Sequence, residues 1–355
     1  MRLLPVILAL LLIVPTARAA DPPKKDKELE DTVNKALAFL KNTQREDGSW
    51  SAVQGGGRNA AITGLCVMAF LSAGHVPGEG PYAETVEKGI RFVLKVQQAN
   101  GLIAGEGRHE MYHHGICTLM LAEVAGMTEG PLADEVRRKL EKAVAVILKG
   151  QRKDPSRFAS AVGGWRYSVN GIDADISVTG WQIMALRAAK NLGCDVPPEA
   201  IERAIEFVKR CQDPNTGGFR YMPGSRITVA CTGTSILALE LCGKDQHRSD
   251  PVLKAAGFLL KYPPRWGDHQ FSYSMYYCSQ ATFQLGGQYW NSYREQMHKV
   301  LFRNRSDSGG WFGADPVSQT YGPNYTTAMA ILALTVEYRY LPIYQRGEEP
   351  TDKDK

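Results

Sequence analysis

The feature that most constrains the fold is a repeated alternation of two kinds of apolar segment, separated by a glycine-aromatic turn. An amphipathic segment with helical periodicity ends at a turn such as Gly48-Ser49-Trp50 or Gly163-Gly164-Trp165, and a more apolar segment follows. The pattern occurs six times, with Ile103 in the aromatic position of the second copy, and its turn recurs about every 45 to 60 residues, a spacing typical of stacked helix-pair repeats. The sequence therefore predicts six helical hairpins.

The two helices of each hairpin differ in how they distribute apolar residues. The first has one polar face, as in 201–209, whereas the second is apolar nearly all round, as in 183–186. A helix with one polar face lies at a surface, and a helix that is apolar on all sides is packed on most sides. We therefore predict an all-α (α/α)6 toroid with an amphipathic outer ring and an apolar inner ring. An open solenoid is the alternative, but neither end unit has the polar capping face that such a stack needs.

The ends of the chain differ from the repeat. Residues 1–20 combine Arg2, an apolar stretch and Ala17-Arg18-Ala19, which is the layout of a cleaved secretory signal peptide; a short membrane anchor is the alternative. We expect a polar linker at 21–30, a single toroid domain at 31–343 and a disordered tail at 344–355. The protein is thus predicted to be exported to the periplasm or cell envelope of a bacterium, without an integral membrane segment after cleavage.

Composition excludes several classes of function. The net charge of +5 is small for 355 residues, and the basic residues are dispersed, which argues against a nucleic-acid partner. The seven cysteines are also dispersed and contain no C-x-x-C pair, which argues against zinc ribbons and thioredoxin-like redox sites. The sequence does not indicate any disulfide pairing, and we predict no metal and no other cofactor.

The turns carry a resemblance to a known family. The spacing of Phe39-Leu40, Gln44, Gly48 and Trp50 resembles the QW repeat of squalene and oxidosqualene cyclases. Weaker copies end at Trp165, Phe219 and Trp311. The repeat is also similar to that of protein prenyltransferase β subunits. Segments 163–182 and 325–342 resemble a branch of small exported bacterial toroid proteins. The resemblance implies a toroid with an apolar isoprenoid-type ligand in its central cavity, although a fold by itself does not specify a function.

Departures from these families put the reaction in doubt. Triterpene cyclases have two toroid domains and an acid motif D-x-D-D, whereas this chain has room for one toroid, and its segment 173–176 retains two of the three carboxylates. The zinc ligands of prenyltransferase β subunits have no convincing match. The sequence therefore leaves it uncertain whether the protein is an enzyme; if it is one, it resembles a terpenoid cyclase, an isomerase or a transferase.

Polar residues at the starts of the inner helices are the candidate site, because the N-terminal ends of those helices should meet at the mouth of the cavity. Asp173 and Asp175 are candidate acids, since a carboxylic acid with a raised pKa can protonate an alkene. The alternative is that Asp175 caps its helix. His114 is the third catalytic candidate, because we expect it to face the cavity; a histidine that is hydrogen-bonded in the core is the alternative.

His109, Glu110 and His113 match H-E-x-x-H, which places two histidines one helical turn apart and can hold zinc. No third ligand is apparent, so we predict no metal at this motif. The remaining candidates are ligand-binding residues, whose rings could stack on a ligand or simply fill the rim. These residues are Arg58, Tyr112, His113, Trp181, Tyr276, Tyr277, Tyr321 and Tyr325.

Three functions remain open. The first is binding of an apolar isoprenoid-type ligand, with acid catalysis by Asp173 or Asp175. The second is a non-catalytic binding or scaffold protein. The third is a glycan-active enzyme, which would need Arg58, Arg166 and Arg226 to converge near a base. Protein partners and oligomeric state are not indicated by the sequence.

Overall fold

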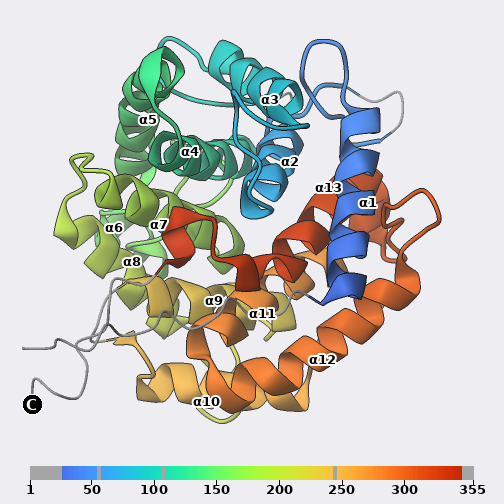
Figure 1. Ribbon diagram of the computed structural model, residues 1–355. Coiled ribbons are helices and arrows are strands. Elements are labelled where there is room, and N and C mark those ends of the chain that lie inside the picture. The colour runs from blue at the N-terminus through green and yellow to red at the C-terminus, as the bar shows by residue number, and fades with distance from the viewer. Residues whose placement is uncertain (1–25, 54–56, 105–108, 243–245, 346–355) are drawn as a thin grey trace, which may run out of the picture.

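The computed structural model describes residues 26–53, 57–104, 109–242 and 246–345. Within these residues, long helices alternate between an outer and an inner ring (Figure 1). The outer helices are α1 (Lys27–Thr43), α3 (Ala83–Val96), α5 (Gly130–Gly150), α8 (Pro198–Arg210), α10 (Asp250–Lys261) and α12 (Gly287–Asn304). The inner helices are α2 (Ala60–Ser72), α4 (Glu110–Met127), α7 (Ile176–Asn191), α9 (Val229–Leu241), α11 (Phe271–Leu285) and α13 (Pro316–Leu334).

The inner ring is closed. Each inner helix packs on the next in the order α2, α4, α7, α9, α11 and α13, and α13 packs in turn on α2. An open stack would leave α2 and α13 apart. The predicted toroid of six hairpins is therefore confirmed, and the solenoid alternative is wrong.

Burial follows the predicted difference between the two helices of each hairpin. Every residue of the inner helix α2 is buried, whereas the outer helix α8 buries one face and exposes Glu199, Glu202 and Glu206. The apolar inner helices can thus be buried on all sides because the outer helices shield them from water.

Each turn ties an outer helix to its neighbours through a glutamine and an aromatic ring. The Nε2 of Gln44, at the end of α1, donates to Gly48 O at 3.1 Å and to Thr85 O on α3 at 2.9 Å. The indole Nε1 of Trp50 donates to Leu40 O at 2.8 Å. The same glutamine bridge recurs at Gln97, Gln151 and Gln212. The bonds to Leu40 O and Gly48 O satisfy carbonyl groups in the last turn of α1 and in the following turn, where no helical N–H is available, and the bond to Thr85 O links the turn to α3.

Glycine is required where a turn meets the next outer helix. Gly48 has φ +86°, and a Cβ there would lie 2.2 Å from Lys88 O on α3. At the sixth turn, Gly309 has φ +95°, and a Cβ would lie 2.4 Å from Lys35 O on α1. The last unit therefore contacts the first in the same way as the first contacts the second, which closes the outer ring.

Ordered structure extends past both boundaries of the predicted domain. α1 begins at Lys27, inside the predicted linker, because Asp26 caps it by accepting a hydrogen bond from Glu28 N, and Leu29 is already buried. Tyr344 begins the predicted tail but is buried, with its hydroxyl 2.6 Å from that of Tyr276. The predicted signal peptide, at residues 1–20, lies outside the described residues.

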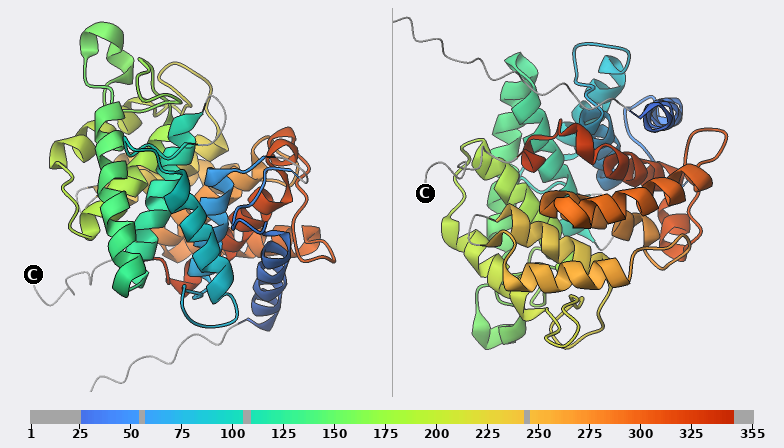
Figure 2. Two further views of the ribbon diagram at one scale, coloured as in Figure 1. Left: turned by 90° about the horizontal axis from the view of Figure 1, so that it is seen from above. Right: turned by 60° about the horizontal axis from the view of Figure 1, so that its bottom comes forward.

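The segment after α13 crosses the centre of the ring (Figure 1) as two short 3-10 turns, Val336–Tyr338 and Pro342–Tyr344. Between α5 and α7, the short helix α6 (Pro155–Phe158) and the turn Ala159–Ala161 project from the body (Figure 2). None of the helices in the described ranges combines the length and the apolar character needed to cross a bilayer.

Candidate functional site

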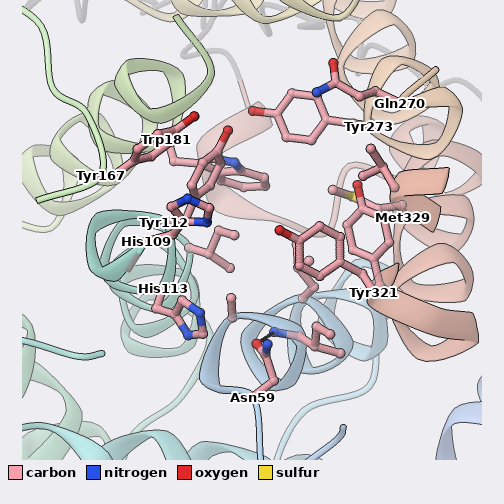
Figure 3. Close-up of a pocket in the computed structure, with 16 residues that line it drawn as sticks. Asn59, His109, Tyr112, His113, Tyr167, Trp181, Gln270, Tyr273, Tyr321 and Met329 are labelled. Carbon is pink, nitrogen blue, oxygen red and sulfur yellow. Dashed lines mark hydrogen bonds between the residues drawn. The ribbon is translucent and has the colours of Figure 1, made fainter. Parts of the chain in front are cut away.

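A cavity of about 350 Å³ opens where the inner helices begin (Figure 3). Its lining comes from residues on or next to α2, α4, α7, α11 and α13, together with Tyr167 from the turn before α7. The lining residues are Asn59, Ala61, Ile62, Leu65, His109, Tyr112, His113, Ile116, Tyr167, Trp181, Gln270, Tyr273, Val317, Tyr321, Tyr325 and Met329. The cavity thus lies at the end of the ring where the sequence places it.

Helix caps hold the polar rim in place. Asn59 accepts a hydrogen bond from Ile62 N at 3.0 Å at the start of α2, and Asp175 accepts one from Val178 N at 2.9 Å at the start of α7. These side chains satisfy N–H groups that have no partner within the helix. Capping therefore stabilises the starts of α2 and α7, which lie at the cavity end of the ring.

Trp181 and His113 line the cavity with buried polar atoms that have no hydrogen-bond partner. These atoms are the indole Nε1 of Trp181 and the Nδ1 of His113. Burial lowers the pKa of His113 to about 4, so its ring is neutral near pH 7.

Asp175 is completely buried but does not line the cavity. Its Oδ1 accepts from Ser177 Oγ at 2.7 Å and from Val178 N, and its Oδ2 accepts from Tyr221 OH at 2.9 Å. Arg166 Nε lies 3.1 Å from Oδ2, as an ion-pair contact without hydrogen-bond alignment. Burial raises the pKa of this carboxyl, while its hydrogen bonds and Arg166 act in the opposite direction. The capping role proposed as the alternative for Asp175 is therefore present.

Asp173 lies nearer the surface. Its side chain is 39% exposed and pairs with Arg166, so one guanidinium joins both candidate acids. Neither carboxyl lines the cavity. The structure thus brings Asp173 and Asp175 together, but neither side chain reaches the cavity.

His114 is buried and points away from the cavity into the packing between the two rings. Its Nδ1 accepts from Ile103 N at 3.1 Å, so its Nε2 carries the proton that is donated to Ala143 O at 2.9 Å. Burial lowers its pKa to about 4. In other repeats a threonine hydroxyl accepts the same turn N–H, at Thr63, Thr179, Thr232 and Thr327. His114 therefore takes the place of this threonine, and the expectation that it faces the cavity is wrong.

The predicted ligand-binding residues divide into two groups. Tyr112, His113, Trp181, Tyr321 and Tyr325 line the cavity. The other three do not: Arg58 is exposed and pairs with Asp47 at 2.6 Å, Tyr276 stacks on Trp181 with ring centroids 5.6 Å apart, and Tyr277 packs edge-on against Trp181. Tyr276 and Tyr277 thus pack against the Trp181 ring without lining the cavity themselves.

The H-E-x-x-H residues do not assemble a metal site. Glu110 Oε1 accepts from Ser168 Oγ at 3.0 Å and from Val169 N at 2.8 Å, so it anchors the turn before α7. His109 packs against the Tyr167 ring at 4.3 Å. Across the described part of the chain, no three histidine, cysteine or acidic side chains come together as metal ligands would.

Comparison with known proteins identifies the family. The sequence model of the prenyltransferase alpha-alpha toroid domain matches residues 6–155 and 171–262. The chain belongs to this family. The match spans most of the inner helices that line the cavity.

Solved structures share the fold of this toroid protein. An inactive variant of the α-1,6-mannanase GH76A of Salegentibacter sp. HEL1_6, in complex with α-1,6-mannotriose, matches with a TM-score of 0.65 and 14% identity, covering 86% of this chain and 99% of that chain. The type II terpene cyclase MstE from Scytonema, without ligand, matches with a TM-score of 0.58 and 14% identity over 90% of this chain and 100% of that chain. A substrate complex of MstE with geranylgeranyl dihydroxybenzoate gives a TM-score of 0.55 at 16% identity over 88% of this chain and 98% of that chain. At such identities the likeness concerns the fold alone.

Some lining residues of this toroid were not among the sequence candidates. Tyr167 follows the turn Gly163-Gly164-Trp165 by two residues, and Gln270 precedes α11 in a left-handed conformation with φ +61°. An aromatic residue just after the turn marker is a signal that could have identified Tyr167. Nothing in the periodicity marks Gln270, because its place depends on how the chain enters α11.

Proposed function

We propose that this toroid protein binds an uncharged, apolar ligand of isoprenoid type in the cavity at the start of the inner helices. The observation that carries the proposal is the character of the lining. Ile62, Leu65, Ile116 and Met329 supply aliphatic surface, and tyrosine and tryptophan rings supply half of the remaining lining residues. A volume of about 350 Å³ lies within the range of small-molecule sites, roughly 300–1,000 Å³.

The charge of the lining supports the same conclusion. Among the described residues, the lining contains no lysine, arginine, aspartate or glutamate. His113 is neutral near pH 7, because burial lowers its pKa to about 4. An apolar chain gains free energy on entering such a site, whereas a charged group would lose its hydration without gaining a partner.

Binding is better supported than acid catalysis. An acid must reach the reacting atom within hydrogen-bond distance or through one water. Asp175 instead lies outside the cavity lining, and both of its carboxylate oxygens already accept hydrogen bonds. Asp173 also lies outside the cavity, where it pairs with Arg166. The glycan alternative required three arginines to converge on the site, yet neither Arg58 nor Arg166 nor Arg226 lines the cavity.

Trp181 provides a test of the proposal. It is the one tryptophan in the lining, so an entering ligand should change its fluorescence. Titration of the protein with farnesol should give a saturable change in tryptophan emission. Trp181→Phe should abolish that change, whereas Trp290→Phe should retain it, because Trp290 lies on the outer helix α12 and bonds to Glu337.

Two results would overturn the proposal. One is the absence of saturable farnesol binding, measured independently by calorimetry. The other is saturable binding of mannotriose in place of farnesol, which would instead favour the glycan alternative.

A further inference from the structure

Three tyrosines of the cavity direct their hydroxyl groups at the segment from Asp175 to Ser177, two of them directly and one through Tyr221. Tyr112 OH donates to Ser177 Oγ, and Tyr273 OH donates to the backbone oxygen of Ser177 at 2.9 Å. Tyr167 OH lies 2.6 Å from Tyr221 OH, which in turn donates to Asp175. In the view of Figure 3, Tyr112, Tyr167 and Tyr273 lie along the side of the cavity opposite Asn59. We call these three residues the tyrosine wall.

The direction of each hydrogen bond follows from its final acceptor. A backbone oxygen can only accept, so Tyr273 must donate to Ser177. Ser177 Oγ gives its single proton to Asp175 Oδ1 at 2.7 Å, so the proton between Tyr112 and Ser177 must come from Tyr112. Tyr221 gives its proton to Asp175 Oδ2, so the proton between the two phenols must come from Tyr167.

Burial raises the pKa of Asp175, but its hydrogen bonds and the Arg166 charge oppose that effect and favour the ionised form that accepts these bonds. Val178 N–H donates to Oδ1 at 2.9 Å, and the Arg166 guanidinium lies 3.1 Å from Oδ2. The same guanidinium lies over the ring of Tyr167, 4.8 Å from its centroid. Burial raises the pKa values of Tyr112 and Tyr221, so both remain protonated phenols near neutral pH. Each of the three wall tyrosines therefore has its only proton committed away from the cavity.

The tyrosine wall can therefore accept hydrogen bonds from a ligand through its oxygen lone pairs, but it has no free proton to donate. We propose that it selects a ligand whose uncharged polar end donates a hydrogen bond, such as an alcohol attached to an apolar chain. This inference rests on the proposed function, because it concerns the polar end of the molecule bound in the same cavity. An ether of the same chain cannot donate, and a diphosphate would place negative charge against lone pairs with Asp175 behind them.

The test compares farnesol with farnesyl methyl ether, which share a chain and differ in the donor. One hydrogen bond contributes about 1 kcal/mol, so farnesol should bind the wild-type protein about fivefold to tenfold more tightly than the ether. Farnesyl diphosphate should bind more weakly than farnesol. Equal dissociation constants for alcohol and ether would overturn the inference and leave the proposed function standing. Binding of neither would overturn both.

Two variants test whether the network sets the preference. Ser177→Ala and Tyr221→Phe remove the acceptors of Tyr112 and Tyr167, and neither replaced residue lines the cavity. Each frees a phenol proton to turn toward the ligand, so the ratio of ether to alcohol dissociation constants should fall toward one. A purely structural role would weaken both ligands equally and keep the ratio, which would contradict the inference.

Ser279→Ala is the matched control. Ser279 is a buried serine whose Oγ donates to Tyr276 O at 2.7 Å, outside the network around Asp175. This variant should keep the wild-type preference for the alcohol. Thermal unfolding of all three variants shows which of them retain the fold. Ser177→Ala and Tyr221→Phe then give two independent measurements of the ratio of ether to alcohol dissociation constants.

Discussion

At the scale of single residues, the His114 side chain forms two hydrogen bonds that link different elements of the repeat. It accepts the buried Ile103 N–H of its own turn and donates to Ala143 O of the outer helix α5. Threonine at the same position in other repeats accepts the turn N–H but is too short to reach the next outer helix in the same way. His114 therefore ties together α4, its turn and α5.

We predict that His114→Ala lowers the free energy of unfolding by about 1–3 kcal/mol, because it leaves the buried Ile103 N–H without a partner. Urea unfolding followed by circular dichroism measures the change. His269→Ala, at an exposed position before α11, should change the unfolding free energy by less than about 0.5 kcal/mol. A His114→Ala protein as stable as the control would show that these hydrogen bonds contribute little.

At the scale of secondary-structure elements, the contact between α4 and the C-terminal segment depends on Glu123. This side chain is 1% exposed, and its Oε2 accepts from Ile343 N at 3.3 Å. Its Oε1 has no partner, and burial raises the pKa of the carboxyl to about 8. The segment that crosses the centre of the ring is thus held in part by a carboxyl group that is protonated at neutral pH.

This contact predicts a loss of stability at high pH. The pKa of Glu123 in the folded protein, about 8, exceeds that of an unfolded glutamate, about 4.5, so the folded state binds more protons between these values. The contribution of Glu123 is therefore fully present below about pH 4.5 and is lost as pH rises through 8. Glu123→Gln should remove this loss, because an amide keeps the acceptor for Ile343 N without a titrating proton.

Melting temperatures from pH 5 to pH 9 measure the effect. Relative to the wild type, Glu123→Gln should gain about 2–4 kcal/mol of stability across this range, the order of magnitude of a shift of about three pKa units. Glu30→Gln, at an exposed position on α1, should follow the wild-type profile. Parallel profiles for wild type and Glu123→Gln would mean that another group controls the alkaline limit.

At the scale of the whole molecule, stability depends on the seam where the last unit meets the first. The turn glycine Gly309 lies against Lys35 of α1, and α13 packs on α2. Every other outer-ring contact joins neighbours in sequence, whereas this one joins the two ends of the domain. The seam therefore makes the ring a single closed unit rather than a row of repeats.

We predict that Gly309→Ala destabilises the protein more than Gly193→Ala does. Both glycines have positive φ, +95° and +85°, but a Cβ at Gly309 would lie 2.4 Å from Lys35 O, and a Cβ at Gly193 meets nothing within 4 Å. Gly193→Ala should cost about 1 kcal/mol through its backbone conformation alone. Gly309→Ala should cost about 1–3 kcal/mol more, because the turn must move away from α1. Equal unfolding free energies for the two variants would show that the seam adjusts without cost.

The sequence by itself determined the hairpins and their number, because amphipathic and apolar helices and glycine turns are local patterns with a fixed period. It also indicated that Asp175 caps a helix, since capping involves residues that are close in the chain. The same local logic marked Tyr112, Trp181 and Tyr325 near the starts of inner helices, and these residues do line the cavity.

Only the tertiary structure decided which face of each inner helix meets the cavity. His113 and His114 are neighbours in the chain, yet successive residues of a helix point about 100° apart, so one lines the cavity and the other bonds α5. That rotation is set by packing on both neighbouring inner helices, which lie many residues away in sequence. The partners of Asp175 and the burial of Tyr344 depend in the same way on contacts that form only when the ring closes.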